Sequence, residues 1–180
     1  SESAMHLTLS AHSILCRWVT CVSHTVDGRV VSGGMDSRIC LWRRDVNGCL
    51  DLVGHQGSIS GLGCLDGVIV SSSYDKSVKI WNHITGKEES TMLGHKAPIV
   101  KLLAGGKANL ATGDRGGSVL IWDMASLHLL WRLKKIHKGH ITALQWLSAS
   151  ETESTDGRFC TGGQDGILRM WDLRDKTNTF

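Results

Sequence analysis

The sequence predicts an all-β protein built from four similar units, each made of four antiparallel strands. Glycine is abundant at 21 of 180 residues and proline occurs once. The turns therefore rest on Gly, Asp, Asn and Ser, as in chains of many short strands. In addition, an apolar segment that ends in tryptophan recurs four times along the chain. Short apolar segments between turn residues argue against a helical bundle.

The four copies of this segment are regularly spaced. They are Val31–Trp42, Val70–Trp81, Ala111–Trp122 and Cys160–Trp171, and successive tryptophans lie 39, 41 and 49 positions apart. A period of roughly 40 to 45 residues with four strands in each unit is typical of a β-propeller blade. Four copies make chance repetition a poor explanation.

Each copy contains two strands joined by a short turn, as in Arg29–Val31 followed by Arg38–Leu41, which predicts a hairpin. A further apolar run precedes the hairpin and predicts the first strand: Val19–Val22, Ile59–Leu65, Ile99–Leu103 and Ile141–Leu147. A run that follows three of the hairpins predicts the fourth strand: Leu50–Val53, Ser90–Leu93 and Leu129–Leu133.

These strands divide the chain into successive blades. Residues 1–12 are expected to form an outer strand and turn that complete a blade. Blade 1 is expected at 13–54, blade 2 at 55–94, blade 3 at 95–136, and blade 4, lacking its outer strand, at 137–180.

Short motifs at the strand ends resemble those of the WD-repeat family. Gly54-His55 and Gly94-His95 precede first strands, and Trp122-Asp123 and Trp171-Asp172 close third strands. The resemblance covers nearly the whole chain. Trp42-Arg43 and Trp81-Asn82 lack the acidic second residue, which varies within the family.

The resemblance implies a hydrogen-bonded chain inside each blade, formed by a Trp, a Ser or Thr, a His and a turn Asp. An indole N–H is a buried donor that needs an acceptor, and a hydroxyl can pass the chain through imidazole to a carboxylate. The residues that match are His12, Ser32, Asp36 and Trp42 in blade 1; His55, Ser71, Asp75 and Trp81 in blade 2; His95, Thr112 and Trp122 in blade 3; and His137, Thr161, Asp165 and Trp171 in blade 4.

In three blades the match to the family pattern is not straightforward. His12 fits only with a short insertion before the first strand. In blade 4, aligning Ile141 with Ile59 selects His137 rather than His140. In blade 3, Gly116 stands where the Asp is expected, so we expect the blade 3 histidine to lack its carboxylate and this blade to be the least rigid.

The chain begins with the kind of strand that its last blade lacks, which leaves two arrangements open. One is a closed ring of four blades. The other, which we favour, is four blades of a larger ring, typically seven in the family, with the remainder outside this chain or supplied by a partner. The start at Ser1 rather than Met also favours the second arrangement.

No catalytic motif is present. The sequence has no Gly-x-Ser-x-Gly, no phosphate-binding Gly-rich Lys loop and no His-Glu-x-x-His. We therefore expect a non-catalytic protein-interaction scaffold without a metal or cofactor, whose nine histidines are structural or on the surface.

The family resemblance also implies a face that binds protein or peptide partners, built from the loops before the first strand and between the second and third strands. The residues expected on it are Trp18, Met35, Ser58, Tyr74, Pro98, Arg115, His140 and Gln164. Tyr, Trp, Arg and Met are enriched at interface hot spots.

The sequence leaves two other classes of partner open. The segment from Phe159 to Arg174 resembles the box by which some WD-repeat proteins dock on the adaptor of a cullin-RING ubiquitin ligase, and this implies that Arg174 pairs with the adaptor. An RNA- or chromatin-associated scaffold is disfavoured because the net charge is only +3.

The six cysteines include no Cys-x-x-Cys pair and lie partly in apolar runs. This pattern favours free thiols over disulfides or metal ligands, and a reducing location in cytoplasm or nucleus. No apolar run approaches the roughly 18 residues of a membrane span, and no signal pattern is present, so we expect no membrane insertion.

Overall fold

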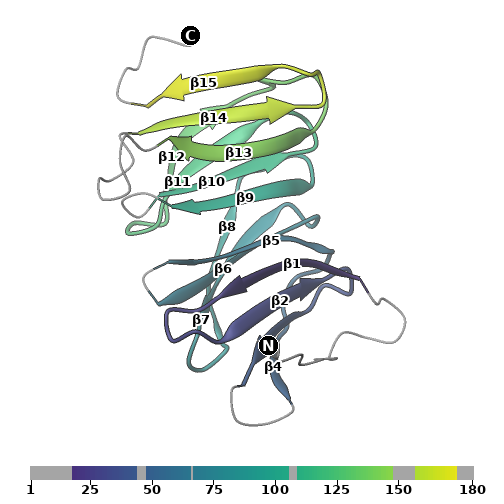
Figure 1. Ribbon diagram of the computed structural model, residues 1–180, viewed down its shortest axis with the longest axis vertical. Coiled ribbons are helices and arrows are strands. Elements are labelled where there is room, and N and C mark those ends of the chain that lie inside the picture. Colours follow the sequence, from purple (N-terminus) through teal and green to yellow (C-terminus); the bar gives the residue numbers. More distant parts are fainter. Residues whose placement is uncertain (1–17, 44–47, 66, 106–108, 148–156, 174–180) are drawn as a thin grey trace, which may run out of the picture.

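The computed structural model describes residues 18–43, 48–65, 67–105, 109–147 and 157–173. Within these ranges the chain forms β-strands and no helix, in three four-stranded sheets and one three-stranded sheet (Figure 1). Every strand pairing is antiparallel and joins strands that are consecutive in the chain. The predicted all-β fold is confirmed.

Each sheet is one blade. Blade 1 contains β1 (Val19–His24), β2 (Val30–Gly34), β3 (Ile39–Trp42) and β4 (Cys49–Leu52). Blade 2 contains β5 (Ile59–Leu65), β6 (Val68–Ser73), β7 (Ser77–Asn82) and β8 (Glu88–Leu93). Blade 3 contains β9 (Ile99–Gly105), β10 (Asn109–Asp114), β11 (Val119–Asp123) and β12 (Leu129–Leu133). Blade 4 contains β13 (Ile141–Leu147), β14 (Arg158–Gly163) and β15 (Leu168–Asp172).

The central hairpin turn shares one backbone feature in all four blades. The residue five positions before each tryptophan has a positive φ: 67° at Ser37, 74° at Lys76, 78° at Gly117 and 74° at Gly166. Two blades place glycine there, which adopts this conformation without strain. The repeat is therefore a structural one, and equivalent positions can be compared directly.

Neighbouring blades pack through a repeated apolar interface. In blade 1, Ile39 and Leu41 lie in one buried cluster with Ile59, Ile69 and Trp81 of blade 2. The equivalent pair in blade 2, Val78 and Ile80, packs on Ile99, Leu110 and Trp122 of blade 3. In blade 3 the pair is Val119 and Ile121, which pack on Ile141, Phe159 and Trp171 of blade 4. The third strand of each blade thus supplies one half of the interface, and the next blade supplies the other half.

The two end blades each expose one half of that interface. Leu168 and Met170, equivalent to buried Val78 and Ile80, are 67% and 50% exposed. At the other end, Val19 and Val30 are equivalent to fully buried Ile59 and Ile69 but are 51% and 44% exposed.

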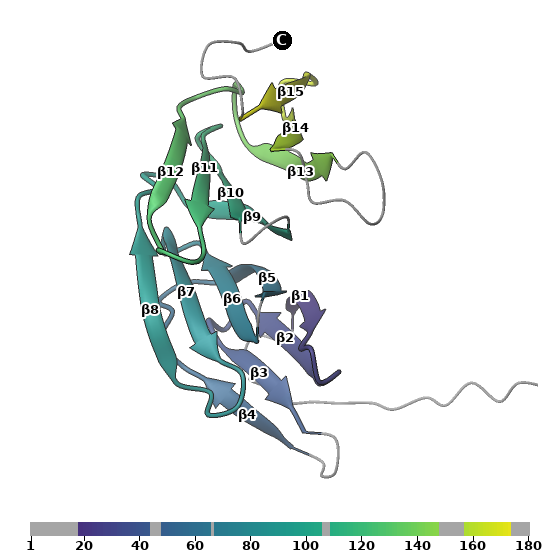
Figure 2. The same ribbon diagram turned by 90° about the vertical axis from the view of Figure 1, so that its left-hand side faces the viewer.

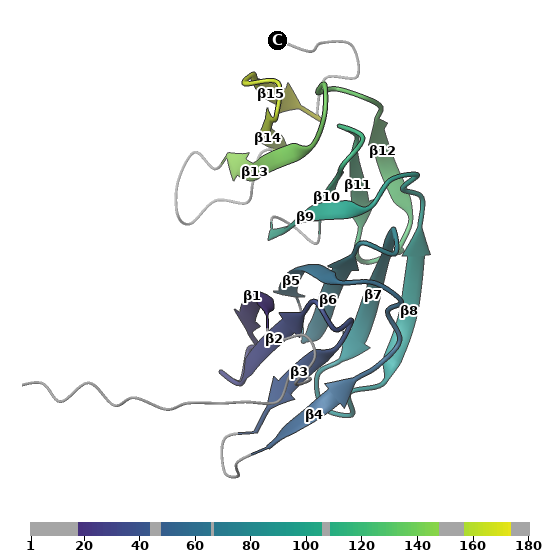
Figure 3. The same cartoon turned by 90° about the vertical axis from the view of Figure 1, so that its right-hand side faces the viewer.

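The blades follow one another along an open arc. Figures 2 and 3 show blades 2 and 3 between β1 and β13, so the described strands do not close a ring of four. Among the described residues there is no helix long and apolar enough to cross a membrane.

We expect the isolated chain to self-associate through these end faces, because exposed halves of an apolar interface gain free energy when they are buried. Replacing both Leu168 and Met170 by Glu should shift sedimentation-velocity profiles toward monomer. Ile84→Glu, which alters a 71% exposed side chain in the β7–β8 turn, should leave association unchanged. A monomer at every concentration of the parent chain would contradict this expectation.

Candidate partner-binding face

A backbone contact repeated in each blade brings the predicted face residues together. The carbonyl of the residue before the first strand accepts a hydrogen bond from the N–H of the residue that follows the second strand. Met35 N–H donates to the Trp18 carbonyl at 3.1 Å, and at 2.9 Å Tyr74 donates to Ser58, Arg115 to Pro98 and Gln164 to His140. All eight residues therefore lie at the same end of the strands, at one edge of the arc.

The pairs of blades 1 to 3 present large side chains to solvent. Trp18 is 73% exposed, Tyr74 43% and Met35 41%. The guanidinium of Arg115, from blade 3, lies over the ring of Tyr74, from blade 2, at 5.9 Å from its centroid. Ser58 in turn donates its hydroxyl to the Met35 carbonyl at 3.1 Å. These contacts join three successive blades into one surface.

A buried hydrogen-bond network supports this surface in blade 2. The Trp81 indole N–H donates to Ser71 Oγ at 2.8 Å, and Ser71 Oγ lies 2.8 Å from His55 Nε2. His55 Nδ1 lies 2.7 Å from Asp75 Oδ2. The Asp75 carboxylate also accepts the N–H of Gln56 at 2.9 Å. The network thus ties the loop that carries Ser58 to the turn that carries Tyr74.

The charge states in this network follow from burial and hydrogen bonding. Burial lowers the pKa of His55, and this outweighs the opposing contact with Asp75. Burial by itself raises the pKa of Asp75, but hydrogen bonds from the Ser77 hydroxyl and from the backbone N–H groups of Gln56 and Ser77 lower that pKa to about 2. Near neutral pH a neutral imidazole therefore faces a carboxylate anion.

Blade 4 uses the histidine that the alignment selects. His137 Nε2 lies 2.8 Å from Thr161 Oγ1, which accepts the Trp171 indole N–H at 3.0 Å, and His137 Nδ1 lies 2.8 Å from Asp165 Oδ1. Hydrogen bonds to Asp165 lower the pKa of its carboxyl, although burial opposes them. His140 is half-buried and belongs to the face.

In blade 3 the prediction that the histidine lacks a carboxylate is wrong. His95 Nδ1 lies 2.8 Å from Asp114 Oδ2, and His95 Nε2 lies 2.8 Å from Thr112 Oγ1. Thr112 Oγ1 accepts the Trp122 indole N–H at 2.8 Å. Asp114 is the last residue of β10, two positions before Gly116, and is 3% exposed. Its carboxylate reaches the imidazole from the strand rather than from the turn. Blade 3 therefore has the same histidine–carboxylate contact as blades 2 and 4, and the reason to expect it to be the least rigid no longer holds.

Blade 1 is described only in part. Trp42 donates its indole N–H to Ser32 Oγ at 2.9 Å, and Asp36 Oδ1 accepts the Arg38 N–H at 3.2 Å. The predicted contributions of His12 and Arg174 lie outside the described residues.

Sequence reasoning missed a basic pocket beside the face on blade 3. The pocket has a volume of about 360 Å³. Its lining includes four basic residues, Lys96, Arg132, Lys134 and Lys135, together with His95 and one acid, Asp114. Gly116 also lines it and adds no side chain. The signal in the sequence was the Lys134-Lys135 pair together with the glycine at the position of the turn acid.

Comparison with known proteins identifies the family. The sequence profile of the family described as "WD domain, G-beta repeat" matches residues 5–43, 48–82 and 131–172. The chain belongs to this family.

The relatives are longer proteins. The chain is 30% identical over 162 residues to the ciliary WD repeat-containing protein ctxp80 of Euplotoides octocarinatus, covering 89% of this chain and 21% of the relative. It is 28% identical over 127 residues to the p21-activated protein kinase-interacting protein 1-like of Gallus gallus, covering 70% of this chain and 32% of the relative. The chain thus spans about one fifth of the first relative and one third of the second.

A solved structure has a similar fold. The crystal structure of the computationally designed Ika8 protein superposes with a TM-score of 0.78 at 28% identity. The superposition covers 92% of this chain and 48% of the designed chain. The arc of described blades therefore corresponds to about half of that longer chain.

We expect Asp114→Ala to destabilise the chain by about 2–3 kcal/mol, because it leaves the His95 imidazole and two turn N–H groups without their acceptor. The second variant, Asp114→Ala combined with Gly116→Asp, moves the carboxylate to the position used in blades 2 and 4 and should recover much of that loss. Arg115→Ala, at the exposed neighbour, should change stability by less than about 0.5 kcal/mol. Urea unfolding of the three variants measures these differences, and equal effects of Asp114→Ala and Arg115→Ala would contradict the network.

We also expect the stabilising effect of Asp75 to depend on pH. Because its folded-state pKa is lowered to about 2, its contribution is complete above the unfolded-state value near 4 and is lost as the pH falls toward 2. The difference in unfolding free energy between the parent chain and Asp75→Asn should therefore shrink between about pH 4 and pH 2. Thermal or urea unfolding across that range measures it, and a constant difference would contradict the shifted pKa.

Proposed function

We propose that this chain is a non-catalytic scaffold that binds a protein partner through the face formed by its eight paired residues. The observation that carries the proposal is the backbone pair repeated in four blades, which places exposed Trp18, Met35, Tyr74 and Arg115 at one edge of the arc. Aromatic, Met and Arg side chains at the centre of a surface are the types that dominate binding energy.

The face is preorganised, which favours binding. Tyr74 lies in a turn held by the His55–Asp75 contact, and its ring is already in contact with the Arg115 guanidinium. Side chains that are ordered before binding lose less conformational entropy when a partner docks. A cation over an aromatic ring also adds attraction without a rearrangement.

The charges on the face favour an acidic partner. Lys76, Lys96, Arg115 and Lys138 are exposed in the loops at this end of the strands. The carboxylates of Asp75, Asp114 and Asp165 instead contact histidines and turn N–H groups. The basic pocket continues the positive surface along blade 3. We therefore infer a partner segment that carries Asp or Glu residues next to an apolar anchor.

Family membership supports a protein partner without choosing one. The name of the Gallus gallus relative states that it interacts with a protein kinase, while the architecture hosts many unrelated roles. The cysteines of the described residues are all free thiols, which fits the proposed location in cytoplasm or nucleus. Docking on a cullin-RING adaptor through Arg174 stays a prediction.

We expect Tyr74→Ala combined with Arg115→Ala to weaken partner binding by about 2 kcal/mol or more, roughly thirtyfold, because it removes a rigid aromatic anchor and the cation above it. The measurement is affinity capture with quantitative mass spectrometry, followed by titration of the recovered partner. Capture that is unchanged by the double variant would move the site elsewhere.

Two controls sharpen this test. Ile84→Ala with Lys87→Ala alters exposed residues at the β7–β8 turn, at the opposite end of the strands, and should leave capture intact. A salt titration separates partner classes, since a nucleic acid partner loses affinity steeply with salt, whereas an acidic protein segment loses it moderately.

A further inference from the structure

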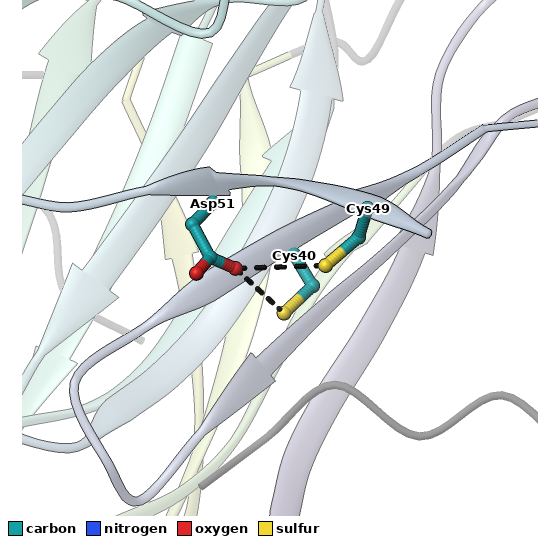
Figure 4. Close-up of side chains that lie close together, drawn as sticks. All are labelled: Cys40, Cys49 and Asp51. Atoms are coloured by element: carbon teal, nitrogen blue, oxygen red, sulfur yellow. Dashed lines mark hydrogen bonds between the residues drawn. The ribbon is translucent and has the colours of Figure 1, made fainter. Parts of the chain in front are cut away.

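Two cysteines and an aspartate of blade 1 converge on one point between β3 and β4. Figure 4 shows the sulfur atoms of Cys40 and Cys49 directed toward the same carboxylate oxygen of Asp51. Both sulfur atoms lie 3.5 Å from Asp51 Oδ1, and all three atoms lie within 4.8 Å of one another. Cys40 pairs directly with Asp51 across the two strands, and Cys49 lies two residues before Asp51. The antiparallel register therefore creates this cluster.

The two sulfur-to-oxygen distances are compatible with a tetrahedral metal ion. Zinc binds a cysteine sulfur at about 2.3 Å and a carboxylate oxygen at about 2.0–2.2 Å, which separates sulfur from oxygen by about 3.5 Å at a tetrahedral centre. Both sulfur-to-oxygen distances in the cluster have this value. All three atoms lie within 4.8 Å of one another, close enough for one small cation to bring them together as ligands.

A neighbouring arginine orients the carboxylate. Arg38 Nη1 donates to Asp51 Oδ2 at 3.1 Å, so the other oxygen, Oδ1, is the one directed at the two sulfur atoms. Metal-binding carboxylates are commonly held in this way by a hydrogen bond to their second oxygen. The arrangement is the one expected of a ligand fixed before the ion binds.

The equivalent position in blade 2 already holds a positive charge. There Lys79, equivalent to Cys40, places its ammonium 2.7 Å from Glu88 Oε1 and 2.8 Å from Thr91 Oγ1. Lys79 pairs with Thr91 across the strands as Cys40 pairs with Asp51. In blade 1 the thiol of Cys40 replaces the lysine, and the carboxylate of Asp51 offers a metal-ligating oxygen where blade 2 has Thr91.

The site is accessible from one side. Cys40 is buried, but Cys49 is half-buried and the Asp51 side chain is 37% exposed, so an ion and a water molecule can enter from the Asp51 side. A bound zinc ion deprotonates its thiol ligands, and up to two protons leave for each ion bound.

We propose that Cys40, Cys49 and Asp51 bind one divalent, thiol-preferring cation of the zinc class, with water as the fourth ligand. The site links the outer strand β4 to β3. It stabilises blade 1 and does not depend on the proposed function.

The experiment uses the reduced 180-residue chain, first stripped of metal with a chelator. Titration with Zn²⁺ alone should show one tight equivalent by calorimetry, with proton release detected as a dependence of the heat on buffer ionisation enthalpy. Titration with Co²⁺ should give the visible and sulfur-to-metal absorption of a four-coordinate thiolate site. The melting temperature should rise with zinc.

Matched variants locate the ion. Cys49→Ser and Asp51→Asn should each weaken binding by about tenfold or more, whereas Cys64→Ser, at a half-buried thiol on β5, should bind as the parent does. Cys49→Ser should also remove the sulfur-to-metal absorption of one ligand, a change that a merely structural effect would not produce. No tight equivalent in the parent chain, or binding unaffected by both Cys49→Ser and Asp51→Asn, would overturn the proposal.

Discussion

The constraint on which this structure depends is the burial of an indole N–H in every blade. A buried donor without an acceptor costs a large part of a domain's stability, and each blade meets this cost in the same way. In all four, the tryptophan at the last or second-to-last position of the third strand donates to a hydroxyl ten residues earlier on the second strand. In blades 2, 3 and 4 the hydroxyl contacts a histidine from the preceding loop. The face loops are thereby attached to the core of the sheet.

Contacts that are local in the chain could be predicted from the sequence. The hydroxyl and the indole lie on adjacent strands of one hairpin, so the turn fixes their separation and register. The carboxylate is different. The imidazole needs an acceptor close to its Nδ1 atom, and more than one position in the sequence can supply it. Asp75 and Asp165 reach it from the turn, but Asp114 reaches it from the end of β10. Counting positions from the tryptophan therefore missed Asp114.

Contacts between blades and across strands could be predicted only in part. The family resemblance implied that Tyr74 and Arg115 lie on one face, but their contact depends on the spacing of two blades and on side-chain rotamers. The basic pocket likewise needs the position of β12 relative to the loop before β9. Cys40 and Cys49 are nine residues apart and form no short-spaced pair, so only the register of β3 and β4 brings them together. Sequence spacing does not contain this information.

The same repeat explains where differences between blades can carry chemistry. Positions directed at the next blade are confined to apolar residues, as at Ile39, Val78 and Val119, because they form the core. The next residue along each of these strands points to the opposite face of the sheet and varies more in type, although in blade 3 it also packs in a buried apolar cluster with Val78 and Ile80 of blade 2. It is Cys40 in blade 1, Lys79 in blade 2 and Leu120 in blade 3, opposite Asp51, Thr91 and Arg132. In blades 1 and 2 these places hold polar contacts that are specific to the blade, whereas in blade 3 the place is part of the apolar core.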